Sequence, residues 1–196
     1  MPRVSDAHLA ARRQQILDAA RVCFLHNGFH ATSMQDVIRE AGLSVGAVYR
    51  YFPSKSHLVT ALAEQVIQDV IDMFDRLVAE DPPAPPAKAL GGAVDLVTEM
   101  SAPGGPLRLA LQVWSESQRD PMLAEFVAKT YRRLREKVVL IARRAQEHGH
   151  LPPDADPEAV GSVLFAMMPG YGLQRMLTGE PEPETFKAGL RTLLTQ

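Results

Sequence analysis

The sequence predicts an all-α fold in which an N-terminal three-helix head of the helix-turn-helix type is joined by one long helix to a larger helical body. Three observations support this prediction. Apolar residues recur three and four positions apart along most of the chain, whereas runs of alternating apolar and polar residues are absent. Glycine and proline stand where these periodic segments stop, and a serine or an aspartate stands where several of them begin.

The head is built from three helical segments. An amphipathic helix is expected over residues 8–27, and Gly28 ends it. In the next segment, TSMQDVIREAG, Ser33 can cap a short helix together with Asp36, three residues later, and Gly42 ends that helix. The segment SVGAVYRYF then forms a second short helix.

The body begins with a long helix, expected from about Lys55 to Glu80, whose wide apolar arc requires several helices to pack on it. Its length would be roughly 39 Å at 1.5 Å per residue. Further helices are expected over residues 87–101, 106–119, 121–148, 157–178 and 182–195, with an interruption at PGYG (169–172) in the fourth. The predicted domains are residues 1–54 and residues 55–196.

The composition is that of an ordinary soluble protein, with 46% hydrophobic and 22% charged residues. The formal net charge of −2 is unevenly divided, because residues 1–60 carry a net charge of +3 and the remainder −5. A basic head would approach a phosphate surface first. No apolar stretch of about 18 residues occurs, so no membrane partner is expected. The N-terminus lacks the apolar region of a secretory signal, which indicates a cytoplasmic location.

The two short helices have the pattern of a helix-turn-helix, braced by the first helix. Val48 must turn inward with the other apolar residues of the head, which leaves the opposite side of residues 44–51 in solvent. That side is rich in small residues and could enter a major groove about 12 Å wide. The alternative is an ordinary helical hairpin with its aromatic residues in the core. However, Tyr49, Tyr51 and Phe52 cannot all face one core from one helix, so we expect some of them to be exposed.

The run from Arg13 to Leu58 resembles the DNA-binding head of the tetracycline-repressor (TetR) family. The similarity rests on the segment ILDAA, on the spacing of Gly28 and Thr32, on the segment AGLSVGAVYRYF and on Lys55. It covers about a quarter of the chain, and the remainder is similar to the family only in being all-helical. The resemblance implies a transcriptional regulator that binds double-stranded DNA, and a second domain for ligand binding and dimerisation.

The resemblance also implies which residues touch DNA. Tyr49 and Lys55 correspond to phosphate-contacting positions, which fix the register without reading the sequence. Thr32 and Ser33 correspond to the point where the second helix directs its N-terminal N–H groups at a phosphate. The positions that correspond to contacts with base edges are Gln35, Val45, Ala47, Arg50 and Tyr51. Ser44 lies on the same exposed face of residues 44–51, and Gly46 completes the set of candidates.

Among these candidates, Gln35 and Arg50 have the chemistry to read adenine and guanine, respectively. A phosphate contact is an equally good interpretation of Arg50. Val45 and Ala47 offer only apolar contacts, for instance to thymine methyl groups. Gly46 is unfavourable inside a helix but lets the backbone approach DNA closely.

For the body, the resemblance implies a homodimer in which residues 157–178 and 182–195 pack against their symmetry mates as a four-helix bundle. The last helix carries Phe186, Leu190, Leu193 and Leu194 on one face, and the alternative is that this face completes the monomer core. Paired heads about 34 Å apart would match successive major grooves of a palindromic operator.

The expected effector is a small hydrophobic molecule, aromatic or cationic in the manner of a dye, that releases the protein from DNA. Methionine and aromatic residues make adaptable apolar pockets. The candidates are Met73, Phe74, Met100, Trp114, Phe126, Tyr131, Phe165, Met167, Met168 and Tyr171, among which Trp114, Met168 and Tyr171 are favoured. For each of them the alternative is an ordinary place in the core. A DNA-binding regulator without an effector is the second candidate function.

An enzyme is not expected, because the sequence has no HExxH, GxSxG, phosphate-loop or paired-cysteine motif. His148 and His150 flank Gly149 and are better explained by the end of a helix, whose dipole favours them. The single cysteine, Cys23, is interpreted as a small buried hydrophobic residue. No cofactor and no metal site are expected.

Overall fold

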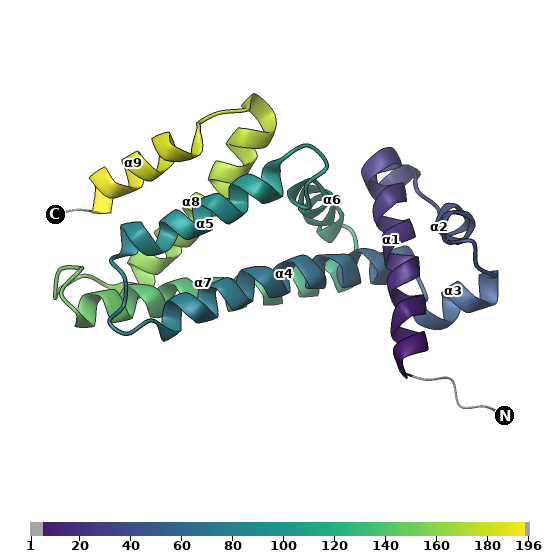
Figure 1. Cartoon of the computed structure of the whole chain (residues 1–196), viewed down its shortest axis with the longest axis horizontal. Helices are drawn as coiled ribbons and strands as arrows, with labels where there is room; N and C mark the ends of the chain where they lie inside the picture. Colours follow the sequence, from purple (N-terminus) through teal and green to yellow (C-terminus); the bar gives the residue numbers. More distant parts are fainter. Residues whose placement is uncertain (1–5, 195–196) are drawn as a thin grey trace. The chain divides into compact units, whose positions relative to one another are not determined.

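The computed structural model describes residues 6–194 and confirms the all-α fold (Figure 1). Within these residues the chain forms nine helices and no strand. The helices are α1 (Asp6–Ala31), α2 (Met34–Ala41), α3 (Val45–Tyr51), α4 (Lys55–Ala79), α5 (Pro86–Ser101), α6 (Leu107–Ser117), α7 (Pro121–Glu147), α8 (Pro157–Thr178) and α9 (Pro183–Leu194).

Contacts divide the described residues into two compact units. The head unit contains the residues up to Val66 together with Leu109–Phe126. The body unit contains Ile67–Arg108 and the residues from Val127 onward. Most of α6 and the start of α7 therefore belong with the first helices, and these units do not follow the division expected after residue 54. The extent of the DNA-binding domain itself stays a prediction.

The helix boundaries of the head follow the signals expected from the sequence. Gly28 adopts φ 79° and ψ 165°, which breaks the helical path of α1 near its end. Ser33 caps α2 in a complete capping box, in which the Ser33 N–H donates to Asp36 Oδ2 (2.9 Å) and the Asp36 N–H donates to Ser33 Oγ (3.2 Å). Gly42 ends α2 in the left-handed conformation, with φ 63°.

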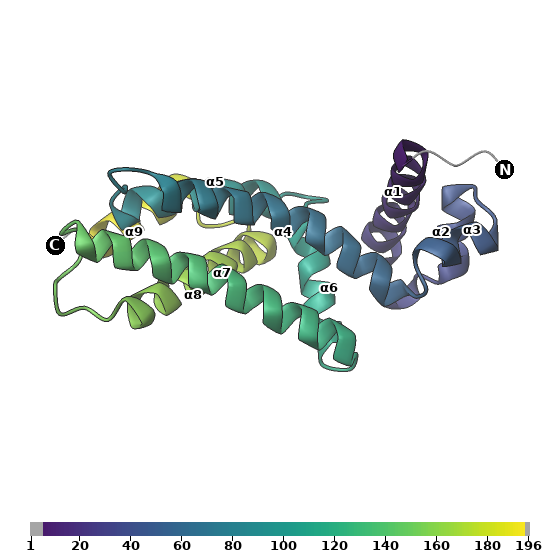
Figure 2. The ribbon, with the colours of Figure 1, turned by 90° about the horizontal axis from the view of Figure 1, so that it is seen from below.

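A buried apolar core joins these helices, and α2 and α3 lie on the same side of α1 (Figures 1 and 2). Each of the first four helices contributes large side chains to the core of the head unit. They are Ile16, Leu17 and Phe24 from α1, Val37 and Ile38 from α2, Val48 from α3, and Leu58, Val59 and Leu62 from α4.

The body unit has a second core, in which α8 and α9 both pack on α5 (Figure 1). Tyr171 is fully buried, and its hydroxyl lies 2.7 Å from that of Thr98 in α5. The Lys187 ammonium of α9 donates to Asp95 Oδ1 of α5 (2.6 Å). These polar contacts fix α8 and α9 on α5 alongside the apolar packing.

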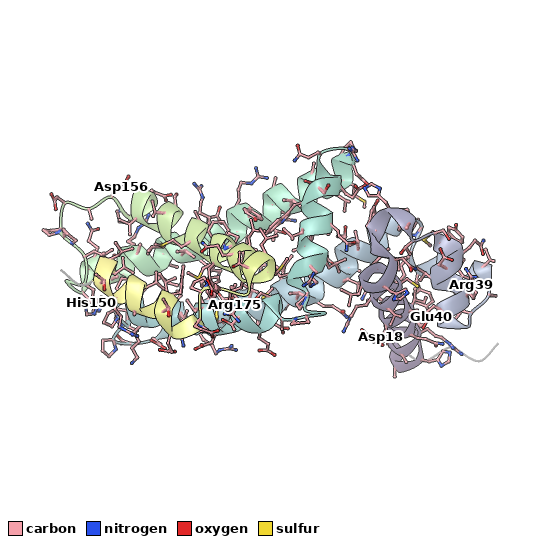
Figure 3. The ribbon with its side chains drawn as sticks, turned by 90° about the horizontal axis from the view of Figure 1, so that it is seen from above. Asp18, Arg39, Glu40, His150, Asp156 and Arg175 are labelled. Atoms are coloured by element: carbon pink, nitrogen blue, oxygen red, sulfur yellow. The ribbon has the colours of Figure 1, made fainter. Side chains whose placement is uncertain are left out.

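The turns of the body unit are held by long side chains. Figure 3 labels His150 and Asp156 at the turn between α7 and α8, where Gln146 Nε2 donates to the carbonyl oxygens of Pro153 (3.0 Å) and Ala155 (2.7 Å). Arg175, labelled near the end of α8, donates to the carbonyl oxygen of Pro181 (2.8 Å) in the turn before α9.

The interruption expected at residues 169–172 is wrong. Helix α8 continues through Pro169 to Thr178. Packing explains this outcome, because Tyr171 is anchored in the core and Gly172 lets α8 approach its neighbours closely. A Cβ atom on Gly172 would lie 2.5 Å from a methyl group of Leu107 and 2.9 Å from one of Val97. These tertiary contacts outweigh the helix-breaking tendency of proline and glycine.

Gly161 marks a second close approach in the body unit, since a Cβ atom there would lie 2.6 Å from the Cα atom of Val139 in α7. Because backbone cannot yield as a side chain can, Gly161→Ala should lower the free energy of unfolding by about 1–3 kcal/mol. Gly92→Ala in α5 is the matched control, since its Cβ atom would meet nothing within 4 Å, and it should raise stability by up to about 1 kcal/mol. Denaturant unfolding at equal protein concentration measures both, and equal stability of the two variants would contradict the close packing of α7 and α8.

Candidate nucleic-acid interface

Helix α3 has one buried side and one open side, as the sequence predicted. Val48 is fully buried, whereas Val45 is 49% exposed and Tyr49 is 42% exposed. Ser44, Gly46 and Arg50 are also exposed, and Ala47 and Tyr51 are half-buried. The open side of α3 is therefore not packed against the core of the head unit.

Gly46 lies on this open side. A Cβ atom at that position would meet no other atom within 4 Å. The packing of the chain itself thus gives no reason for a glycine in the first turn of α3. Close approach by a molecule from outside supplies such a reason.

The start of α2 is the second part of the interface. Ser33 and Gln35 are exposed. The Ser33 hydroxyl and N–H groups hold the pKa of the Asp36 carboxyl below its usual value, with a smaller contribution from Arg39. The capping box uses the N–H of Asp36, and the N–H groups of Met34 and Gln35 have no acceptor within the helix, so they remain suited to an anion.

Thr32, which directly precedes the Ser33 cap of α2, has a buried side chain that is only 1% exposed. Its hydroxyl lies 2.8 Å from the carbonyl oxygen of Gly28 and 3.1 Å from that of Cys23, and it is committed to the end of α1. The expectation for Thr32 concerned the N–H groups at the start of α2 and not this side chain, and a DNA-contacting role for this position stays a prediction. The spacing of Gly28 and Thr32 thus has a structural explanation, because the Thr32 hydroxyl donates to the Gly28 carbonyl oxygen at the break in α1.

Lys55 is also turned toward its own chain. Its ammonium donates to the carbonyl oxygens of Phe29 (2.6 Å) and Thr32 (2.8 Å), and the carbonyl oxygen of His30 lies at 3.4 Å. The ammonium lies 4.4 Å from the centre of the Phe29 ring. Burial lowers the pKa of the Lys55 amine, and the negative charge of Glu116 partly offsets this effect.

Helix α6 meets the same break in α1, which sequence reasoning missed. The Phe29 N–H, left without its helical partner by the turn at Gly28, donates to Gln112 Oε1 (2.7 Å). Glu116 is 9% exposed, and its Oε1 lies 2.6 Å from His30 Nε2. A glycine at the end of a helix indicates that a following N–H group lacks a helical acceptor. No local sequence pattern, however, could identify Gln112, 83 residues away, as the acceptor for the Phe29 N–H.

The candidate ligand-binding residues fall in both units. Trp114 and Phe126 belong to the head unit and the other eight to the body unit. Phe74, Met168 and Tyr171 are buried members of the body core, with Met73, Phe165 and Met167 packed against it. Met100 is half-buried. The Tyr171 ring lies 4.4 Å from that of Phe186 and its hydroxyl bonds Thr98, so Tyr171 is part of the core.

Tyr131 and Phe165 form an edge-to-face pair, with ring centroids 5.4 Å apart and planes at 84°. Both residues are half-buried, and burial raises the pKa of the Tyr131 hydroxyl. A half-buried aromatic pair has the chemistry of a site for an apolar or cationic ligand. A ligand-binding role for these residues stays a prediction.

The outer face of α8 carries an exposed stripe of apolar and small residues, which we call the α8 stripe. Its members are spaced alternately four and three positions apart: Ala159, Val163, Ala166, Gly170, Leu173 and Leu177. Val163 is 61% exposed and Leu177 is 73% exposed. In α9 only Leu193 of the four expected apolar residues is exposed, because Phe186, Leu190 and Leu194 pack in the body core. This spacing on α8 is typical of a helix that packs against another helix.

Among residues 6–194, no group of three or more His, Cys, Asp or Glu side chains could hold a metal ion. Cys23 is buried, as expected. None of the described helices has the length and apolar character that a membrane span requires.

Comparison with known families gives two matches. Residues 16–62 match the family described as bacterial regulatory proteins, tetR family. Residues 97–196, which make up just over half of the chain, match the C-terminal domain of BetI-type transcriptional repressors. The two matched segments include α3 with its open side and α8 with its stripe.

Relatives extend over nearly the whole chain. The transcriptional regulator UidR of Escherichia coli (strain K12) is 25% identical, covering 93% of this chain and 90% of that protein. BetI of Burkholderia lata is 28% identical, covering 92% and 89%. Salmonella enterica GusR has a similar structure, with a TM-score of 0.78, 26% identity and full coverage of both chains.

A second similar structure is that of a putative transcriptional regulator from Saccharomonospora viridis in complex with choline. It has a TM-score of 0.73 and 25% identity, and the comparison covers 94% of this chain and 95% of that one. With a helix-turn-helix head, a helical body and matches to both parts of the family's architecture, the chain belongs to the TetR family of transcriptional regulators.

Proposed function

We propose that the protein is a ligand-responsive repressor that binds a palindromic operator as a homodimer in the cytoplasm and leaves it when a small hydrophobic molecule binds. The open side of α3, opposite the buried Val48, is the observation that carries the proposal. A short helix exposed in this way matches a recognition helix, whose first residues meet the base edges of the major groove.

The proposed contacts divide into two kinds. Tyr49, together with Ser33 and the first N–H groups of α2, fixes the register on phosphates. Gln35 and Arg50 are placed to read base edges, with an Arg50–phosphate contact as the alternative. Val45 and Ala47 contribute apolar contacts, and Gly46 allows the close approach. Ser44 and Tyr51 flank this surface at the two ends of α3.

Tyr49→Ala should weaken DNA binding by about ten- to thirtyfold per dimer, since each protomer loses one phosphate hydrogen bond. The loss should be equal for DNA selected by the wild type from a random pool and for unselected DNA, because phosphate contacts carry no sequence information. Tyr49→Phe, which keeps the ring, should lose nearly as much. Fluorescence anisotropy at fixed salt measures all three proteins. Wild-type affinity in both variants would contradict a phosphate contact by the Tyr49 hydroxyl.

A homodimer is supported by the α8 stripe, since exposed apolar side chains in this spacing are rare on monomeric helices. In the proposed dimer, α8 and α9 of one protomer pack against α8 and α9 of its partner. Two heads are then presented together, and their combined binding far exceeds that of one head.

Val163→Glu in the α8 stripe should dissociate the dimer, because it places two carboxylates in an apolar contact between copies. Val22→Glu is the matched control, since Val22 is 53% exposed on α1 and lies outside the stripe. Sedimentation analysis should give a monomer for the first variant and a dimer for the second, with operator affinity at least a hundredfold lower for the monomer, by a rough estimate. A dimer in both variants would contradict the α8 interface.

The effector proposal rests on the body unit. Tyr131 and Phe165 form a half-buried aromatic pair, Phe165 packs against the body core as do Met73 and Met167, and the similar regulator from Saccharomonospora viridis is in complex with choline. We therefore propose an apolar or quaternary-ammonium effector. Its action is a shift of population: it releases DNA only as far as it binds the non-operator conformation more tightly.

A thermal-shift screen of hydrophobic and quaternary-ammonium compounds, choline included, tests this proposal. The effector should raise Tm and weaken operator binding. In the Phe165→Ala variant, the effector concentration needed for each effect should be about tenfold higher. Operator affinity without effector should stay near that of the wild type. If no compound stabilises the protein or alters operator binding, the regulator without an effector becomes the better candidate.

A further inference from the structure

Lys55 is the first residue of α4 and follows α3 after a linker of three residues. A lysine ammonium has three protons to donate. In this chain three carbonyl oxygens surround it, from Phe29 (2.6 Å), Thr32 (2.8 Å) and His30 (3.4 Å). Its hydrogen-bonding capacity is therefore used within the head unit, before any DNA is bound.

These carbonyl groups need a donor because of the break at Gly28. With φ at 79° the helical path of α1 is interrupted, and the turn that follows leads directly to the Ser33 cap of α2. Carbonyl oxygens at a helix end have no helical donor. A compact ammonium can serve several of them at once, and the Phe29 ring beneath it adds a cation–π contact at 4.4 Å.

The hydrogen bond from the Lys55 ammonium to the Thr32 carbonyl oxygen connects the two ends of the helix-turn-helix. Thr32 directly precedes the cap of α2, and Lys55 directly follows the linker after α3, so one hydrogen bond joins two points 23 residues apart. Both DNA-facing helices lie between these two points. This bond therefore restrains the start of α2 relative to α3, in addition to the buried side chains of the two helices.

We infer that Lys55 is a positioning residue, which holds α2 and α3 in the arrangement that fits DNA by binding the carbonyl groups of residues 29–32, and that it is not a phosphate contact. The inference rests on the proposed DNA binding and changes the role that the family resemblance implied for Lys55. The two roles differ in a measurable way. A lysine bound to phosphate displaces counterions, so its loss lowers the slope of log affinity against log salt by about 0.9, or about 1.8 for a dimer.

The experiment compares Lys55→Met and Lys55→Arg with the wild type and with Lys88→Met, whose lysine is exposed on α5 in the body unit. Binding to DNA selected by the wild type is measured at several salt concentrations and well below Tm. As a positioning residue, Lys55 should give a Met variant with at least tenfold weaker binding, an unchanged salt slope and a Tm lower by about 3–8 °C. The planar guanidinium does not fit the space of a compact ammonium, so the Arg variant should be weakened as well.

Three results would overturn the inference. A slope reduced by about 1.8 in the Met variant, with wild-type binding in the Arg variant, would show a phosphate contact. A lower Tm with wild-type affinity would show a role in stability alone. Wild-type behaviour throughout would show that Lys55 does neither. Failure of the wild type itself to bind any DNA would instead refute the proposed function.

The wild-type protein provides a test that does not depend on the folding of variants. An amine-reactive reagent should modify Lys55 more slowly than Lys88, both without and with selected DNA, because the Lys55 ammonium is engaged in either state. If Lys55 reacts as fast as Lys88 in the free protein and is protected only by DNA, the inference is wrong.

Discussion

The burial of Val48 is the interaction on which the rest of this molecule depends. Helix α3 has seven residues, and Val48 is its one buried side chain. A helix this short is not stable alone, because nucleation costs more than its few hydrogen bonds return. It forms because Ser44 caps its start, with the Ala47 N–H 3.3 Å from Ser44 Oγ, and because buried Phe52 follows its end. With one side in the core and both ends fixed, the opposite side is presented to solvent as a rigid surface.

The region around Gly28 has a comparable structural importance. The break there leaves a main-chain N–H group and several carbonyl groups without helical hydrogen-bond partners. Side chains from α6, from α4 and from the turn itself provide these partners. Gln112 of α6 accepts from Phe29, and Lys55 of α4 donates to the carbonyl groups. The Thr32 hydroxyl closes the turn from within. The local geometry of the head thus depends on side chains from α4 and α6, which is why part of α6 belongs to the same compact unit.

Local signals in the sequence predicted most of the fold. The capping box of Ser33 and Asp36, the left-handed Gly42 and the Asp156–Pro157 start of α8 all act within a few residues, so the sequence alone shows them. Helix periodicity also placed Val48 inward. Such features need no knowledge of which distant segments meet.

Features decided by tertiary contacts could not be predicted in this way. Pro169 was expected to interrupt α8, but the packing of Tyr171 and Gly172 keeps the helix continuous. Tyr171 lies in the core, the alternative that the sequence left open, because an aromatic residue in a core and one in a pocket have the same helical spacing. The partners of Lys55 and Gln112 lie 23 to 83 residues away, beyond the reach of any local pattern. The family resemblance implied a phosphate contact for Lys55, and its hydrogen bonds to the carbonyl oxygens of Phe29 and Thr32 are the basis of the different role that we infer.

Amide hydrogen exchange on the full-length protein, with and without DNA selected by that protein, tests the central claim most directly. Bound DNA should slow exchange in the first turn of α2, at residues 33–36, and along residues 44–51, because these amides lose access to solvent. Exchange in the body core should change little on the same timescale. If DNA slows exchange elsewhere while residues 44–51 are unaffected, the open side of α3 is not the surface that meets the duplex.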